Sequence, residues 1–306
     1  MPLLQQQASL SILTWKAPDT LRRTLQSLEP LRGLFSDRLV ICQESDPREI
    51  DLATQYGYRA IAISNNVGIQ EGLALAVEKS AGELVLVLEN DCNYIGGESG
   101  NAQLEACLTR FRQHNFDVIK LGELPANPRE KYMKYWDQTF PPKRTLLGML
   151  RRREANACKA EVIAFPEFEA SAVPEIEKLD DHLFLTRSKH AVWTNRAILV
   201  SKDFFLGQLL PFARSNPTAR RVNGLPDLEH AINSPKNRNW WRSADFRIGL
   251  VKPGLFGHKR YDRPALDEKW DTGGVVSTLI SIGSPTEKGL INFPQDSSCR
   301  HEPCDT

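Results

Sequence analysis

The sequence lacks the features that would place it in a membrane or in an oxidising compartment. No segment offers the ~18 consecutive apolar residues of a membrane-spanning helix. The first seven residues, Met1 to Gln7, contain neither the basic stretch nor the apolar core of a secretory signal. The 6 cysteines are too few and too scattered for a disulfide framework. We therefore expect a cytoplasmic protein with reduced thiols.

Neither sign of charge predominates. The chain has 39 Lys and Arg against 38 Asp and Glu, a formal net charge of +1 over 306 residues. Such a balance gives no overall field that would recruit nucleic acid, so we expect no nucleic-acid partner. Cys299, His301 and Cys304 lie close together near the carboxyl end, but no second pair of ligands completes a tetrahedral zinc site.

Glycine-rich phosphate loops are also missing. No Gly-x-x-x-x-Gly-Lys and no Gly-x-Gly-x-x-Gly follows a predicted strand, which argues against P-loop kinases and dinucleotide-dependent dehydrogenases. Residues 14–18, directly after the first predicted strand, contain no glycine. Sugar-nucleotide synthesis needs a glycine-rich, basic loop at that place, so this activity is disfavoured too.

What the sequence does contain is an alternation of strand and helix patterns from residue 8 to about 120. The alternation is typical of a parallel α/β sheet. The apolar run 84–88 is continuous, as in a strand buried on both faces. The pattern weakens after residue 120. Strands are predicted at 10–13, 38–42, 58–63, 84–88, 197–200 and 246–251, and helices from Pro18, over 66–80 and over 202–212.

Acidic residues follow two of the predicted strands. The second strand is followed by Gln43-Glu44-Ser45-Asp46, and the buried strand by Glu89-Asn90-Asp91. Ligands of a parallel sheet bind beyond the carboxyl ends of its strands. Carboxylates one residue apart suit a hard cation such as Mg²⁺ or Mn²⁺. A plain polar turn is the alternative that these residues alone leave open.

Three segments together carry a family resemblance. Residues 9–28 resemble the opening of family 2 glycosyltransferases of the GT-A type, whose first helix carries a Leu…Thr-Leu-x-Ser-Leu pattern. Asn65-Asn66-Val67-Gly68 resembles the Asn-x-Gly before the family's third helix. Ala81-Gly82-Glu83-Leu84, followed by Glu89-Asn90-Asp91, resembles its Ala-Gly-Glu and Asp-x-Asp motifs. The order and spacing agree over roughly residues 8–100.

The resemblance implies a GT-A fold, which is a mixed, mostly parallel sheet flanked by helices. Residues 1–120 would form the nucleotide-sugar-binding half. Residues 121–270 would form the acceptor-binding and catalytic half of the same domain, and 271–306 a C-terminal extension.

The resemblance also implies a donor site with a divalent metal, Mn²⁺ or Mg²⁺. Asp91 would bind the metal, and His258, which follows an apolar strand and a glycine turn, would complete the metal shell. Lys259 or Arg260 could neutralise the departing diphosphate. Lys16 and Glu89 depart from the family's usual Asn and Asp. The residues expected around the nucleotide sugar are Thr14, Trp15, Glu44, Asn66, Gly68, Glu89 and Asn90.

A general base is expected in the segment 224–232. This segment resembles the acidic helix start that supplies the base of inverting family members, and an acidic residue in a first helical turn is stabilised as an anion. Asp227 is the first choice and Glu229 the second. An ordinary acidic first turn is the alternative.

The sequence gives fewer indications of which residues would bind the acceptor. Trp240 and Trp241 could stack on a sugar ring or belong to the core, and Tyr135 and Trp136 leave the same choice. The basic segment 143–153 could touch the inner face of an anionic membrane, or form a solvated helix with a buried apolar side.

The sequence therefore predicts an inverting, metal-assisted hexosyl- or N-acetylhexosaminyltransferase. It would move a sugar from a nucleoside diphosphate, with UDP favoured over GDP, to a hydroxyl of a saccharide, lipid-linked or protein acceptor. The alternative is a catalytically silent nucleotide-sugar-binding protein of the same fold, because the first Asp of the acidic motif is a Glu here.

Overall fold

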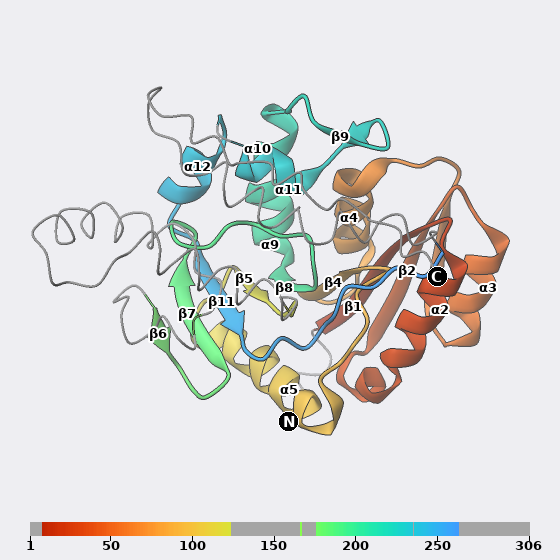
Figure 1. The fold of residues 1–306 in the computed structure, drawn as a ribbon, viewed down its shortest axis with the longest axis horizontal. Helices are drawn as coiled ribbons and strands as arrows, with labels where there is room; N and C mark the ends of the chain where they lie inside the picture. The colour runs from red at the N-terminus through yellow and green to blue at the C-terminus, as the bar shows by residue number, and fades with distance from the viewer. Residues whose placement is uncertain (1–7, 124–165, 167–175, 235, 263–306) are drawn as a thin grey trace, which may run out of the picture.

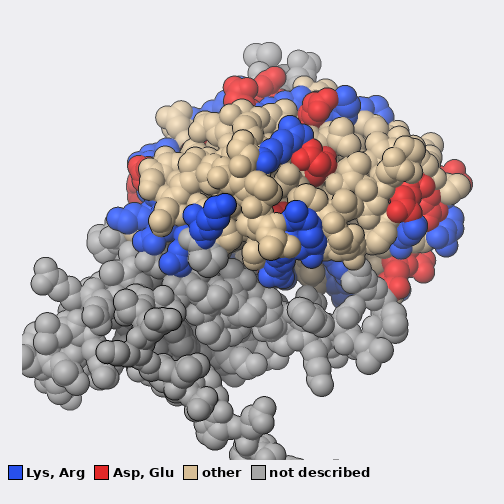
Figure 2. Space-filling view, turned by 90° about the horizontal axis from the view of Figure 1, so that it is seen from above, with Lys and Arg blue, Asp and Glu red and all other residues tan. Residues whose placement is uncertain are grey.

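The structure is a computed structural model that describes residues 8–123, 166, 176–234 and 236–262. The expectations for Tyr135 and Trp136, for 143–153, for the extension 271–306 and for the Cys299–Cys304 segment lie outside the described residues. Among the described helices, none combines the length and the apolar character needed to cross a bilayer. On the face in Figure 2, basic and acidic side chains both occur across the described surface.

The first half of the chain alternates strands and helices as predicted. The helix expected over 66–80 is α4, and the strand expected at 84–88 is β4. In chain order the elements are β1 (Ala8–Trp15), α2 (Pro18–Ser27), a 3₁₀ helix (Glu29–Leu34), β2 (Asp37–Gln43), α3 (Pro47–Gln55), β3 (Arg59–Ile63), α4 (Gly68–Lys79), β4 (Leu84–Glu89), α5 (Gly97–Gln113) and β5 (Val118–Lys120).

The second half has shorter elements. They are β6 (Glu177–Lys178), β7 (Leu183–Arg187), β8 (Ile198–Ser201), α9 (Lys202–Phe204), a π-helix (Phe205–Leu209), α10 (Leu210–Ser215), β9 (Arg221–Val222), β10 (Leu225–Pro226), α11 (Leu228–Asn233), α12 (Arg238–Ser243) and β11 (Arg247–Val251). The single helix predicted over 202–212 is therefore wrong in detail. Pro211 cannot donate an intrahelical bond, and the backbone widens by one residue just before it.

Nine of the described strands form one sheet in the order β3-β2-β1-β4-β8-β5-β11-β7-β6 (Figure 1). Only β8 and β7 run against the other strands. The predicted mixed, mostly parallel sheet is confirmed. Strands from both sides of residue 120 belong to it, because β8 inserts between β4 and β5.

Helices cover both faces of the sheet. Apolar side chains of α2, α3 and α5 pack on one face, in a core that includes Leu10 and Leu86. Side chains of α4 and of the α9–α12 region pack on the other face, against Val85 and Val87. Successive residues of β4 thus point into two cores, and the strand is buried on both faces as its continuous apolar run predicts.

The order of the strands reverses beside β1. The chain passes from β1 to β2 and β3 on one side, and α4 then returns it to place β4 on the other side of β1. The register puts Trp15 opposite Gln43 and Leu13 opposite Glu89. The carboxyl ends of three parallel strands therefore meet at a switch point, which is where open α/β sheets bind ligands.

The start of α4 depends on a glycine. Gly68 has φ +82°, and a Cβ there would lie 2.7 Å from the Cβ of Leu225. We expect Gly68→Ala to lower the free energy of unfolding by about 2–4 kcal/mol, from the left-handed backbone and from overpacking together. Gly224 has φ +80° with open space around it, so Gly224→Ala should cost only about 1 kcal/mol. Urea denaturation of the two variants measures the difference, and equal losses would contradict the packing argument.

Candidate active site

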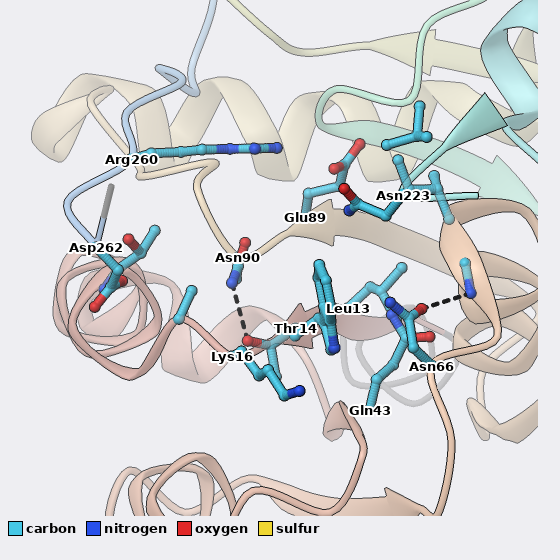
Figure 3. A pocket seen from close by; sticks show the side chains of 16 residues that line it. Leu13, Thr14, Lys16, Gln43, Asn66, Glu89, Asn90, Asn223, Arg260 and Asp262 are labelled. Atoms are coloured by element: carbon cyan, nitrogen blue, oxygen red, sulfur yellow. Dashed lines mark hydrogen bonds between the residues drawn. The ribbon is translucent and has the colours of Figure 1, made fainter. Parts of the chain in front are cut away.

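A cavity of about 330 Å³ opens at the switch point (Figure 3). Its size falls within the range of small-molecule sites. The ends of β1, β2 and β4 line it, together with the start of α4, the β9–β10 hairpin and the segment after β11. Six of the seven residues predicted around the nucleotide sugar line the cavity: Thr14, Trp15, Asn66, Gly68, Glu89 and Asn90.

Glu44, the seventh, is not among the lining residues. Its carboxylate forms an ion pair with Lys16, which does line the cavity. The hydrogen bond from Lys16 lowers the pKa of Glu44. Lys16 and Glu44 both have a positive φ, of 50° and 59°, so the two strand ends turn sharply at this point.

Hydrogen bonds join the ends of β1 and β4. The Asn90 side chain donates to Thr14 Oγ1 at 2.9 Å, and Thr14 in turn donates to Glu49 Oε1 at 2.5 Å. Glu49 is fully buried and also accepts from the backbone of Ala17 at 2.8 Å. Burial raises the pKa of Glu49. The Thr14 hydroxyl is thus held from both sides, and it shapes the cavity wall.

Two amides hold the loop before α4. Gln43 Oε1 accepts from the backbone of Val67 at 2.8 Å, and Asn66 Oδ1 accepts from that of Gly68 at 2.8 Å. Gln43 is almost completely buried. The Gln43 bond ties the loop that carries Asn66 and Gly68 to the end of β2, and the Asn66 bond lies within that loop.

The two predicted metal ligands lie together. Asp91 is fully buried at the end of β4, and its Oδ2 lies 3.2 Å from His258 Nε2 and 2.5 Å from Arg260 Nε. Burial alone would raise the pKa of Asp91, but the His258 hydrogen bond and the nearby positive charges lower it well below its usual range. The Asp91 carboxylate is therefore an anion.

The chemistry of this pair fits a divalent cation. A carboxylate oxygen and an imidazole nitrogen are both donors that Mn²⁺ accepts, whereas Mg²⁺ prefers oxygen alone. Within the described ranges, no group of three or more His, Cys, Asp or Glu is arranged to hold a metal ion. Arg260 contacts the same Asp91 oxygen, so a cation and the guanidinium compete for it.

The segment 257–262 closes one side of the cavity as a strap. It is tied to the β4 end by the backbone bond from Lys259 to Asp91 O, 2.8 Å. At its far end, Asp262 accepts from the backbone of Asp19 at 3.1 Å and of Thr20 at 2.7 Å. The α2 helix has no cap of its own, because Ala17 occupies the N-cap position. Asp262 supplies that cap, and Arg260 extends toward Glu89 (Figure 3).

Replacing Asp262 with alanine is expected to lower the free energy of unfolding by about 1 kcal/mol, the usual value of a helix cap. The same change should weaken ligand binding in the cavity, since Asp262 and Arg260 line it from the strap. Asp51 is an exposed acid of α3, and Asp51→Ala serves as the matched control. Chemical denaturation tests the first effect, and an unchanged midpoint would show that the cap is dispensable.

The two candidate bases begin α11. Asp227 is the N-cap residue and accepts from the backbone of Glu229 and of His230, each at 3.2 Å, and from Asn195 Nδ2 at 3.1 Å. Glu229 Oε2 accepts a longer bond, 3.4 Å, from the backbone of Asn195. Asp227 therefore accepts three hydrogen bonds, whereas Glu229 accepts one longer bond among the described residues.

Electrostatics connect this acid pair to the cavity. Burial raises the pKa of Glu229, and the Asp227 charge adds to the effect, whereas Arg196 and Lys120 oppose it. The pKa of Glu89 is raised to about 8, first by burial and then by Asp91, with further contributions from Asp227 and Glu229. Since Glu89 lines the cavity, the acid pair lies within electrostatic range of it.

The tryptophans of α12 have different surroundings. Trp241 is buried, with its ring close to those of Trp193, Phe204 and Phe246, and so belongs to the core. Trp240 stacks on Phe212 with ring centroids 3.8 Å apart. Of the two alternatives for Trp241, the core position is the one observed.

Comparisons with known proteins give structural similarity only. No protein-family model matches the sequence, and no curated protein matches it. Glucosyl-3-phosphoglycerate synthase from Mycobacterium tuberculosis, in complex with Mn²⁺, UDP and glucosyl-3-phosphoglycerate, is 13% identical over 93% of this chain and 84% of that chain, with a TM-score of 0.46. Residues 1–349 of S. aureus TarS are 12% identical over 83% of this chain and 60% of that chain, with a TM-score of 0.48. At these values neither an activity nor a ligand is transferred to this chain.

Proposed function

We propose that this chain is a GT-A glycosyltransferase that moves a sugar from a nucleoside diphosphate donor to an acceptor hydroxyl. One observation supports this proposal above the others. Six residues expected around the donor, from three separate segments, line one cavity at the switch point of the sheet. The expected metal ligands Asp91 and His258 are in contact beside it.

Positive side chains suit the diphosphate of the donor. Lys16 lies on one side of the cavity and Arg260 on the other. An Arg guanidinium offers several donors in a plane and binds phosphate oxygens well. Arg260 already carries a contact to Asp91, so it can orient the leaving diphosphate next to the acidic end of β4.

Asp91 and His258 are the residues that would hold Mn²⁺ or Mg²⁺. When bound there, such an ion supplies a Lewis acid for the charge that grows on the leaving diphosphate.

The hydrogen bonds favour Glu229 over Asp227 as the base, contrary to the order expected from the sequence. Asp227 accepts three hydrogen bonds and keeps α11 capped, whereas Glu229 accepts one long bond among the described residues. Glu229 would take the proton of the acceptor hydroxyl as the acceptor oxygen attacks the anomeric carbon from the face opposite the diphosphate. This geometry inverts the configuration of the sugar.

The finer parts of the proposal are a UDP-sugar donor, with a GDP-sugar as the second choice, and a saccharide, lipid-linked or protein acceptor. We also propose a cytoplasmic location, with contact to the inner face of the membrane through 143–153 as an addition. A silent nucleotide-sugar-binding protein remains the second function, because Glu89 stands where the family has its first Asp.

Calorimetric titration of the full chain with UDP and with GDP, each with Mn²⁺ and with EDTA, tests the proposal. We expect UDP to bind more tightly with Mn²⁺, and Arg260→Met to weaken binding by ~10-fold or more, the equivalent of one charged hydrogen bond. Arg112 is an exposed residue of α5 outside the cavity, so Arg112→Met should leave binding unchanged.

Sugar transfer from the best-bound donor, followed with a panel of acceptors, then separates the two functions. Absence of nucleotide binding under every condition would overturn the glycosyltransferase proposal. Metal-coupled binding without any transfer or donor hydrolysis would favour the silent protein.

A further inference from the structure

Asn195 lies between β7 and β8 and contacts both candidate bases. The residue is almost completely buried, 3% exposed. The amide Nδ2 donates to Asp227 Oδ1 at 3.1 Å, and the backbone N–H donates to Glu229 Oε2 at 3.4 Å. Asn195 thus donates to both carboxylates, to Asp227 from its side chain and to Glu229 from its backbone.

A tryptophan fixes the orientation of this amide. Trp193 Nε1 donates to Asn195 Oδ1 at 2.9 Å. An indole N–H can only donate, so the atom facing it must be the amide oxygen. The NH₂ group of Asn195 is therefore turned toward Asp227, to which it donates.

The same segment also holds the other end of α11. Asn233 Oδ1 accepts from the backbone of Trp193 at 3.0 Å, and Asn233 Nδ2 donates to Trp193 O at 2.8 Å. These two bonds hold the helix to the segment without touching a carboxylate. Asn195 and Asn233 are therefore matched residues, of which only Asn195 contacts the acid pair.

We propose that Asn195 is a positioning residue for the general base. It engages Asp227 through its side chain and holds Glu229 through its backbone, so that Glu229 is left to accept the acceptor proton. The inference rests on the proposed function in one respect, the use of the acid pair as base. The charged groups that face Glu229 are Asp227 and Glu89, which disfavour its ionisation, and Arg196 and Lys120, which favour it.

Asn195→Asp tests this role, because it keeps the shape and turns the donor into a third acid. A like charge raises the pKa of its carboxylate neighbours. We expect the acidic limb of the pH profile of kcat/KM to move up by about one pH unit, with UDP affinity within twofold of the wild type. Asn195→Ala, which removes the side-chain donor without adding charge, should move the limb in the same direction by less and serves if the Asp variant does not fold.

Asn233→Ala is the control. It breaks the bonds of the same network without adding a charge beside Glu229, and should lower the thermal midpoint while leaving the limb in place. A limb that stays at its wild-type pH in both Asn195 variants, or that moves in Asn233→Ala as far as in Asn195→Ala, would show that Asn195 is merely structural.

Carboxyl ¹³C NMR titration gives a readout independent of turnover. We expect the pKa of Glu229 to rise in Asn195→Asp and to stay unchanged in Asn233→Ala. If the wild-type chain transfers no sugar, the proposed function fails, while this titration still decides whether Asn195 controls the acid pair. An unchanged Glu229 titration in Asn195→Asp overturns the inference.

Discussion

Glu229→Gln is expected to lower kcat by about 10²–10⁴-fold, the usual contribution of a general base. The amide keeps the size of the side chain and its bond from the Asn195 backbone, but it cannot take a proton. Binding of UDP should change little, because Glu229 is not among the residues that line the cavity. Steady-state kinetics with the best donor and acceptor measure the effect.

The pH dependence follows from the direction of the shift. Burial and Asp227 raise the pKa of Glu229, and a base must be ionised to act. In the wild type, kcat/KM should therefore rise with pH through this raised pKa and fall below it. Glu229→Gln should remove that limb from the residual activity.

Asp227→Asn tests whether Asp227, and not Glu229, is the general base. Asparagine caps helices about as well as aspartate, so α11 should remain capped when the charge is lost. If Asp227→Asn loses far more kcat than Glu229→Gln, Asp227 is the base and our assignment is wrong. Glu105 is an exposed acid of α5, and Glu105→Gln controls for the general effect of removing a carboxylate.

Asp91→Asn should have the second large effect. We expect the dependence of UDP affinity on Mn²⁺ to disappear and kcat/KM to fall at least ~100-fold, since a metal ion that stabilises the leaving group contributes several kcal/mol. Calorimetry of UDP binding with Mn²⁺ and with EDTA measures the first, and initial rates the second. UDP affinity that still rises with Mn²⁺ in Asp91→Asn would exclude Asp91 as a ligand.

Asp91→Asn also has a structural cost. Asp91 is fully buried and ties the end of β4 to His258 and Arg260. We expect a loss of about 1 kcal/mol in unfolding free energy, at the low end for a charged hydrogen bond because the Arg260 side chain is 43% exposed. Asp46→Asn, at the N-cap of α3 and outside the cavity, is the control.

Local patterns in the sequence account for the first half of the fold. The helix α4 was predictable because its apolar residues repeat with the helical period, and β4 because its apolar run is continuous. The direction of β8 was not, because its three apolar residues do not indicate which neighbours they join. The π-helix before Pro211 reflects backbone geometry that periodicity does not reveal.

Some residues of the site were also predictable from the sequence, and others were not. Residues at the carboxyl ends of strands, such as Thr14 and Glu89, were predictable because parallel strands end at one edge of the sheet. Glu49 and Asn195 were not, since they act through bonds to residues 35 and 32 positions away. Asp262 joins α2 across 242 positions, and nothing in either segment alone indicates the pairing.

The contact between Asp262 and the start of α2 can form only late in synthesis. A nascent chain on the ribosome presents β1, α2 and β4 long before residue 262 has been translated, so α2 first appears with its amino-terminal N–H groups open to water. The wall formed by Arg260 and Asp262 arrives only afterwards. A truncated chain released before residue 260 is translated would contain most of the sheet but would lack one side of the cavity.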